Sequence, residues 1–309
     1  MKDRPDERLL REVQEFHGLP SAALVEKDWH VVRALSAIHD VSLEGMGLAF
    51  GGGTALGRAH RLIKRMSEDI DFRIVGAEGK GGRALTRFRQ EVTRRLEAAG
   101  FDAERRHVDH RDTYVRYDLP YAPIIKGDGV LRPEIKIELS AGFPVRRPTI
   151  ELAVSSFVAE ARRAGPELVS VRCVSLVDTG ADKFVGLARR AGKAYSRGEE
   201  LDPTLVRHVY DLHCLRGACD LNDLVALAVE VMDAEKARGA EAYQADPMAE
   251  TLAVIAKLSE DKLFVDGYGR LMDDMVFGDK PSFGAAWGVV TEICSAVVGL
   301  KAEPAKCHV

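Results

Sequence analysis

The feature that most constrains the fold is a glycine-rich turn followed by a pair of aspartates. The apolar segment Leu48-Ala49-Phe50 leads into Gly51-Gly52-Gly53-Thr54, and Ser67-Glu68-Asp69-Ile70-Asp71 follows after about one helix length. Residues two apart on a strand point to the same face, so Asp69 and Asp71 would share a face while the residues between them point to the core. The pattern predicts a strand, a glycine turn, a helix and a second strand that presents two carboxylates.

Paired carboxylates beside a glycine turn are typical of a site for metal and phosphate. Like charges held close together repel unless a cation lies between them, and Mg²⁺ is satisfied by carboxylate, water and phosphate oxygens. Two such ions can activate an attacking oxygen and stabilise a leaving one. Glycines before a helix let backbone N–H groups approach a phosphate, and Thr54 would add a hydroxyl donor. Either element alone is weak evidence, but together they indicate nucleotide chemistry at Asp69 and Asp71.

A third carboxylate is expected on a neighbouring strand. Residues 134–139 alternate between charged and apolar side chains, as a strand with one buried face does. Glu138 is therefore the predicted third metal ligand, and Lys136 would point to the same face. The alternative is that Lys136 and Glu138 belong only to an exposed polar face.

The hydrophobic periodicity predicts an α+β fold. A nucleotide-binding α/β half with a mixed sheet, residues 1–165, would precede a mostly helical half, residues 166–309, that closes the cleft. The strand at 169–176 is also compatible with the first half. Helices are expected over 5–17 and 21–39, the second capped by Ser21, and over 83–99, 178–195, 203–216, 221–238, 247–260 and 284–300; strands are expected over 48–50, 70–75, 113–119, 134–139 and 169–176.

Composition argues against several classes of protein. The chain is 46% hydrophobic and 30% charged, the balance of a soluble globular protein, and we find no uninterrupted apolar run approaching the ~20 residues of a membrane-spanning helix. The charged N-terminus lacks a signal-peptide core, so we expect a cytoplasmic protein with no membrane partner. The cysteines are expected to be free thiols, since their spacing with His208 and His213 matches no common zinc pattern; they are Cys173, Cys214, Cys219, Cys294 and Cys307.

Basic residues are concentrated in one segment. Residues 58–116 contain 15 Lys/Arg and 10 Asp/Glu, a net charge of +5, whereas the whole chain carries −4. Solvated helix faces would explain many of these residues. The functional alternative is a basic surface beside the carboxylates that attracts a triphosphate or RNA.

A set of short runs occurs in order between residues 20 and 216. They are Glu26-Lys27-Asp28-Trp29, Gly52-Gly53-Thr54-Ala55-Leu56, Ser67-Glu68-Asp69-Ile70-Asp71, Ile137-Glu138-Leu139, Ala181-Asp182-Lys183 and Arg207-His208-Val209-Tyr210-Asp211-Leu212. Together they resemble the AbiEii nucleotidyltransferase-like toxins of type IV toxin–antitoxin and abortive-infection systems. The combination is specific although each run alone is not.

The resemblance implies a polymerase-β-like nucleotidyltransferase fold and roles for several of the matched residues. Lys183 would hold the triphosphate and Asp211 would be a further catalytic acid. The chain has Ala181-Asp182 where the family commonly has an aromatic residue and Glu, and the alternatives are a solvated Lys183 and a surface Arg207–Asp211 pair. The metal and nucleotide centre would comprise Ser67, Asp69 and Asp71, of which the two aspartates are also catalytic. From the glycine turn, Gly52, Gly53 and Thr54 are expected to hold the phosphates.

The resemblance also implies a reaction and partners. A nucleoside monophosphate would pass from an NTP to an acceptor hydroxyl, favoured to be a tRNA 3′ end, with Mg²⁺ (or Mn²⁺) as cofactor and pyrophosphate as product. A cognate antitoxin would be encoded nearby. Two alternatives remain open: transfer to a protein hydroxyl, and a regulator that binds GTP without transfer.

Overall fold

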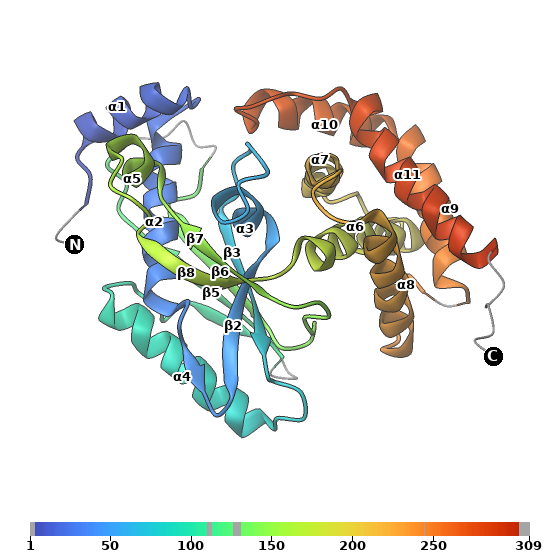
Figure 1. The fold of residues 1–309 in the computed structure, drawn as a ribbon, viewed down its shortest axis with the longest axis horizontal. Coiled ribbons are helices and arrows are strands. Elements are labelled where there is room, and N and C mark those ends of the chain that lie inside the picture. Colours follow the sequence, from blue (N-terminus) through green and yellow to red (C-terminus); the bar gives the residue numbers. More distant parts are fainter. Residues whose placement is uncertain (1–3, 110–112, 126–130, 244, 303–309) are drawn as a thin grey trace. The chain divides into compact units, whose positions relative to one another are not determined.

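The chain forms two compact units, Met1–Val174 and Ser175–Val309, in a computed structural model that describes residues 4–109, 113–125, 131–243 and 245–302 (Figure 1). Cys307 therefore lies outside the described residues. The division falls between β8 (Leu168–Cys173) and α6 (Leu176–Arg197). The sequence-based division at residue 165 lies before β8, whose pairing with β2 puts it in the sheet of the first unit.

The first unit is built around an 8-stranded mixed sheet with the order β4-β5-β6-β3-β2-β8-β7, to which β1 is added through β2. At its centre, β3 (Asp69–Val75) is antiparallel to β2 (Met46–Gly51) and parallel to β6 (Glu134–Ser140). The predicted mixed sheet is thus confirmed. The remaining strands are β1 (Ser42–Leu43), β4 (Arg106–Val108), β5 (Tyr114–Pro120) and β7 (Ile150–Val154).

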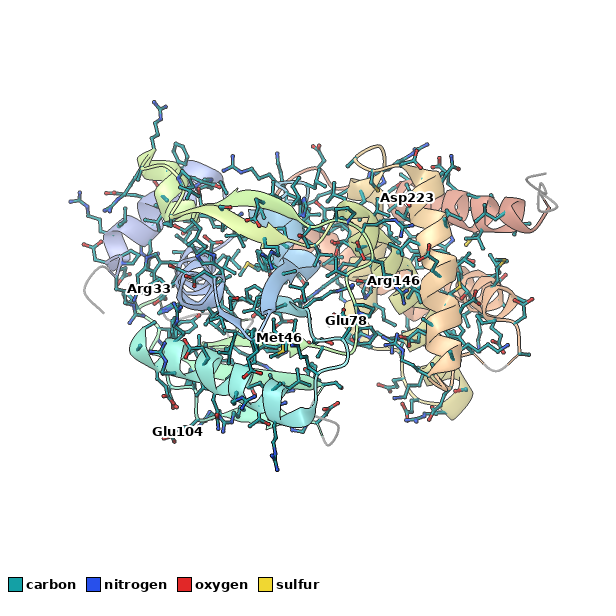
Figure 2. The ribbon with its side chains drawn as sticks, turned by 60° about the horizontal axis from the view of Figure 1, so that its bottom comes forward. Arg33, Met46, Glu78, Glu104, Arg146 and Asp223 are labelled. Atoms are coloured by element: carbon teal, nitrogen blue, oxygen red, sulfur yellow. The ribbon has the colours of Figure 1, made fainter. Side chains whose placement is uncertain are left out.

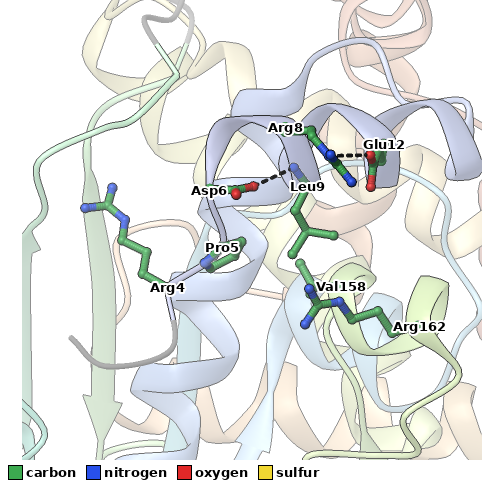
Figure 3. Close-up of a pocket in the computed structure, with 8 residues that line it drawn as sticks. All are labelled: Arg4, Pro5, Asp6, Arg8, Leu9, Glu12, Val158 and Arg162. Carbon is green, nitrogen blue, oxygen red and sulfur yellow. Dashed lines mark hydrogen bonds and ion pairs between the residues drawn. The ribbon is translucent and has the colours of Figure 1, made fainter.

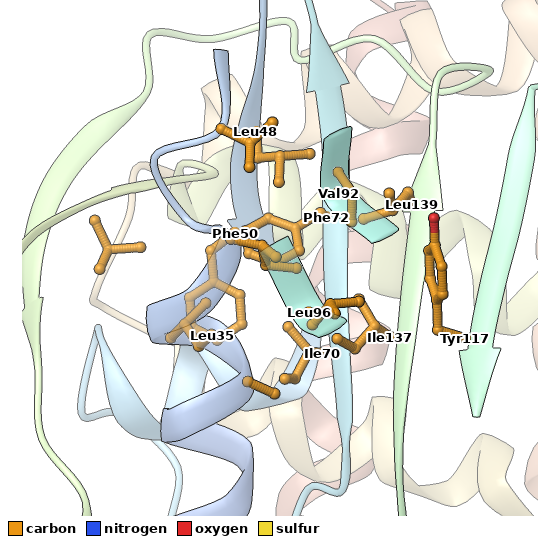
Figure 4. Close-up of a cluster of buried hydrophobic side chains, with 14 of the residues drawn as sticks. Leu35, Leu48, Phe50, Ile70, Phe72, Val92, Leu96, Tyr117, Ile137 and Leu139 are labelled. Atoms are coloured by element: carbon orange, nitrogen blue, oxygen red, sulfur yellow. The ribbon is translucent and has the colours of Figure 1, made fainter. Parts of the chain in front are cut away.

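One face of this sheet is covered by α2 (Ala22–Ile38) and α4 (Gly82–Ala98), which share a core with the strands. Alternate residues of each central strand point into this core, as their sequence pattern predicts, and Met46 lies there too (Figure 2). The helix α2 begins where predicted, because the Ser21 hydroxyl accepts a hydrogen bond from the amide of Ala23. Figure 4 labels core side chains from both helices and four strands: Leu35, Val92, Leu96, Leu48, Phe50, Ile70, Phe72, Tyr117, Ile137 and Leu139.

The opposite face of the central strands is polar and only half-buried. It carries every second residue of β3, β5 and β6, and apart from Val75 and Pro120 these side chains are charged or hydroxylic. Three further helices complete the unit: α1 (Glu7–His17), α3 (Gly52–Arg58) and α5 (Phe157–Arg162). The sheet therefore separates an apolar layer from a polar face, and both predicted aspartates lie on the polar face.

The second unit is helical, as predicted. Its long first helix, α6, packs on α7 (Val206–Leu215), α8 (Leu221–Ala237) and α9 (Pro247–Glu260). A short turn, η1 (Pro203–Leu205), precedes α7, and α10 (Lys262–Asp274) lies in a region where no helix was predicted.

The last helix, α11 (Phe283–Ala302), is long and apolar enough to cross a membrane by length and composition over Phe283–Leu300. Polar residues, among them Glu292, interrupt this stretch, so the sequence contains no unbroken apolar run of membrane-spanning length here. Glu292 is paired with Arg216 of α7 at 3.1 Å, and 28% of the stretch is buried within the protein. One such helix is weak evidence for a membrane span, because a helix that packs in a protein core can have the same length and composition.

Candidate active site

The glycine turn and the aspartates meet where β2 ends. Gly51, the last residue of β2, is the antiparallel partner of Asp71 on β3, and α3 begins at the next residue. No side chain caps α3 at Gly51. The first-turn N–H groups of α3 and the Asp71 carboxylate therefore lie beside each other on the polar face.

Gly52 makes this arrangement possible. Its φ is +69°, in the left-handed region that favours glycine. A Cβ on Gly52 would lie 2.7 Å from Cγ and 2.9 Å from Cβ of Asp71, so any side chain would collide with this aspartate. Glycine is required here both for backbone conformation and for room.

Gly52→Ala is expected to reduce transfer activity about 100-fold or more, because alanine must displace the Asp71 carboxylate, and a misplacement of about 1 Å can cost this much. Gly18→Ala is a matched control, since Gly18 has a φ of +62° and a Cβ added there would meet nothing within 4 Å. Both variants should lose about 1 kcal/mol of unfolding free energy to backbone strain. Equal activity in the two variants would contradict the packing argument.

A hydrogen bond from Thr54 links the glycine turn to β3. Its side chain is buried, and its hydroxyl donates a hydrogen bond to the backbone carbonyl of Asp69. A hydroxyl has one hydrogen to donate, so the phosphate donor expected from the sequence is committed to the protein instead. In the structure, Thr54 holds α3 against the start of β3.

Gly53 is flanked by two polar side chains. A Cβ on Gly53 would lie 2.6 Å from Nη2 of Arg65 and 2.8 Å from Oγ of Ser67. Ser67 was predicted at the site, whereas Arg65 was missed because it stood among many arginines of a basic segment. Its position two residues before Ser67 was the available signal. Arg65 is buried and places a positive charge beside the glycine turn.

Glu138 and Lys136 lie next to the aspartates on the parallel strand β6. The register pairs Asp71 with Glu138 and Asp69 with Lys136, and Nζ of Lys136 lies 3.5 Å from Oδ1 of Asp69. Burial, followed by the charge of Asp69, raises the pKa of Glu138. Both residues are half-buried, so they are not simply an exposed polar face.

Tyr114 on β5 is a second neighbour that sequence reasoning missed. Its side chain is hydrogen-bonded to Glu138, and burial, together with the Glu138 charge, raises the pKa of the phenol. The neutral hydroxyl therefore donates to the carboxylate. The strand was predicted, but the contact depends on the pairing of β5 with β6, which periodicity does not reveal.

The donor set fits a metal that is shared with substrate. Among the residues that the structure describes, no group of three His, Cys, Asp or Glu side chains is arranged to hold a metal ion, so the predicted three-carboxylate set is not preformed. Mg²⁺ commonly takes one or two carboxylates together with substrate phosphates. Asp69 and Asp71, on one face beside a glycine turn, meet that requirement. The role of Glu138 as a third ligand stays a prediction.

Lys183 and Asp211 form a buried ion pair within the helical unit. Nζ of Lys183, on α6, lies 2.8 Å from Oδ2 of Asp211, on α7, and their side chains are 13% and 0% exposed. A solvated Lys183 and a surface Arg207–Asp211 pair are therefore both excluded. The two residues that the resemblance singled out in this unit are brought together.

Much of the basic segment lies away from the carboxylates. The arginines of α4 are on the far side of the sheet, because α4 packs on the apolar face. Arg87 and Arg94 are exposed there and pair with Glu44 and Glu91. The hypothesis that the segment as a whole forms a basic surface beside the site is wrong for α4. Arg116, on the polar face of β5, is one member that remains near the site.

A cavity of about 450 Å³ lies elsewhere in this unit, at the start of α1 and beside α5 (Figure 3). Its walls include none of the residues predicted to form the site. The lining residues are Arg4, Pro5, Asp6, Arg8, Leu9, Glu12, Val158 and Arg162.

Comparison with protein families identifies the chain. The family model for the nucleotidyl transferase AbiEii toxin of type IV toxin–antitoxin systems matches residues 33–289. The chain belongs to this family. An AbiEii protein is a nucleotidyltransferase toxin, which implies an NTP substrate and an antitoxin partner. Comparison with curated proteins finds no match.

One solved structure supports the nucleotidyltransferase fold. MenT4, a nucleotidyltransferase toxin from Mycobacterium tuberculosis, is 17% identical with a TM-score of 0.57, over 96% of this chain and 90% of that chain. The similarity shows a shared nucleotidyltransferase fold. An antigenic nucleotidyltransferase-like protein from Paracoccidioides brasiliensis is 14% identical over 70% of this chain and 92% of that chain, and its TM-score of 0.34 is too low to inform the fold.

Proposed function

We propose that this AbiEii toxin transfers a nucleoside monophosphate from an NTP to the 3′ hydroxyl of tRNA in a reaction that requires a divalent metal. The observation that carries the proposal is the placement of Asp71 directly beside the glycine turn at Gly52, with Asp69 on the same face of β3. Carboxylates and phosphate-binding amides are thus adjacent, as nucleotide transfer requires. Mg²⁺ held by Asp69 and Asp71 would neutralise charge on the phosphates.

The protein side chains position the reactants. Amides of the glycine turn, the Arg65 guanidinium and the Ser67 hydroxyl bind phosphate oxygens, and Lys183, oriented by Asp211, offsets triphosphate charge. The acceptor oxygen forms a bond to the α-phosphorus while the bond from that phosphorus to the bridging oxygen breaks. Pyrophosphate leaves, and the hydroxyl proton is released to solvent.

The acceptor is proposed on chemical and physiological grounds. A tRNA 3′ end is a free hydroxyl on a flexible single strand, which can enter a site without unfolding the rest of the RNA. An added nucleotide would block aminoacylation, and this accounts for toxicity. The substrate is cytoplasmic, where we place the protein, and a cognate antitoxin encoded nearby would neutralise it.

We expect wild-type protein to lengthen tRNA by one or a few nucleotides when it is incubated with α-³²P-labelled NTPs, Mg²⁺ and total RNA. Omission of the divalent metal should abolish the product. Periodate-oxidised tRNA should not be extended, because it lacks the intact 3′ hydroxyl. Denaturing gel electrophoresis would resolve the extended tRNA, and separate reactions with each NTP would identify the preferred base.

Two other results would replace the proposal. Label in protein from a lysate, with none in RNA, would establish a protein-modifying nucleotidyltransferase. Binding of GTP with no label in any macromolecule would indicate a regulator without transfer. Either result contradicts tRNA as the acceptor.

A further inference from the structure

Three consecutive charged residues are buried on α2. Glu26, Lys27 and Asp28 are 2%, 1% and 5% exposed. Charged residues are rarely buried so completely unless they are paired. The run precedes residues 33–289, to which the family model applies, and nucleotide transfer as proposed above assigns it no role.

Lys27 joins two segments that lead into the site. Its Nζ donates hydrogen bonds to Oε2 of Glu68 at 2.6 Å and to the backbone carbonyl of Arg132 at 2.8 Å. Glu68 directly precedes Asp69, the first residue of β3, and Arg132 lies just before β6 begins at Glu134. One ammonium group thus holds the starting ends of both strands.

This contact acts where the sheet has no local constraint on register. β3 and β6 are parallel and are separated in the chain by α4, β4 and β5, so no hairpin turn sets their alignment. A slip of one residue would turn every side chain of a strand to the other face. A tie between the two starting ends favours the observed register, which places Asp69 next to Lys136 and Asp71 next to Glu138.

The neighbours of Lys27 tie down other parts of the same unit. Asp28 accepts a hydrogen bond from the amide of Phe157 at 2.7 Å and pairs with Arg58, the last residue of α3, at 3.4 Å. Glu26 accepts from the amides of residues 124 and 125 and pairs with Arg4. Among the contacts described for these three residues, those of Lys27 lie next to the aspartate strand, at Glu68.

Stability alone does not account for a buried lysine at this position. Burial of an ammonium group costs several kcal/mol, and apolar residues of similar volume often replace a buried ion pair with no loss of stability. The charge is better explained by the geometry it fixes. Side chains that orient metal ligands from behind commonly contribute about 10- to 100-fold to metal affinity.

We propose that Lys27 is a positioning residue that sets the relative register of β3 and β6 through Glu68 and Arg132, and thereby places Asp69 and Asp71 for metal binding. The inference rests on the proposed metal-dependent function.

Mn²⁺ affinity measured by electron paramagnetic resonance, with a non-hydrolysable NTP analogue bound, tests this role without catalysis. Lys27→Met should weaken Mn²⁺ binding by about 10-fold or more. Leu35→Ala, a core change on the same helix, should lower stability without this effect. The double variant Lys27→Met/Glu68→Met should recover stability, because it leaves no unpaired buried charge, yet it should still bind Mn²⁺ weakly.

The outcomes separate the two proposals. Wild-type protein that binds no Mn²⁺ would overturn the metal-dependent function and this role with it. Wild-type binding together with normal affinity in the double variant would overturn only the role of Lys27. If Lys27→Met does not fold, the Mn²⁺ affinity of the double variant, compared with that of Leu35→Ala, tests the role of Lys27 in the same way.

Discussion

Asp71→Asn is expected to abolish nucleotide transfer and leave the fold intact. Asn keeps the size of the side chain, which lies on the half-buried polar face rather than in the core. It removes a negative charge beside the glycine turn, so activity should fall more than about 10³-fold, beyond the cost of losing one preorganised hydrogen-bond donor. Single-turnover rates measure the loss, and thermal melting without metal should show equal or slightly higher stability because repulsion with Asp69 is relieved.

Glu151→Gln provides a matched control for this charge change. Glu151 lies on β7, at the edge of the same sheet, and is largely exposed. Removal of the Glu151 charge should leave both turnover and melting temperature near the wild-type values. Turnover near wild type in Asp71→Asn would refute the carboxylate mechanism, whatever acceptor is used.

Lys183→Ala is expected to have the second large effect, on both stability and NTP binding. Removal of the lysine leaves the fully buried Asp211 without its ion-pair partner, so the free energy of unfolding should fall by about 3–5 kcal/mol. Loss of a charged hydrogen bond to the triphosphate should weaken NTP binding about tenfold or more. Denaturant titration and calorimetric NTP titration measure the two effects.

Two further variants distinguish phosphate binding from a structural role. Lys183→Ala/Asp211→Asn removes both charges and should regain stability, but its NTP affinity should remain low. Arg189→Ala removes a partner of Glu235, another buried carboxylate of the helical unit, and should affect stability alone. Recovery of NTP affinity in the double variant would assign Lys183 a purely structural role.

Sequence periodicity predicted most elements because one face of each is buried. The alternation at residues 134–139 became β6, and the apolar stripe over 83–99 became α4. Three missed strands lack such a pattern: β1 and β4 are two and three residues long, and β7 lies at the edge of the sheet, where little of it is buried. The helix α10 was missed although one of its faces is buried. Short edge elements take their structure from the strand beside them.

The site was predictable in its local parts and not in its long-range contacts. The glycine turn and Asp69-Ile70-Asp71 are encoded within one short stretch of chain. Contacts of Tyr114 with Glu138 and of Lys27 with Glu68 depend on which strands and helices become neighbours, and spacing does not reveal that. The prediction of a basic surface over residues 58–116 was wrong for α4 for a related reason, because the net charge of a segment does not indicate which face of the sheet each arginine lies on.

The strand order also bears on the point during synthesis at which the active site of this toxin can form. β3 carries the aspartates, but its neighbour β6 is made only after α4, β4 and β5, and β8, which pairs beside β2, is made later still. As the chain leaves the ribosome, one edge of β3 therefore stays unpaired until β6 has been synthesised. Such non-local pairing is slow to form. On the proposed function, a truncated or half-made chain would carry both aspartates and no completed site, so translation must pass β6, and then Lys183 and Asp211 of the helical unit, before an antitoxin has an active enzyme to restrain.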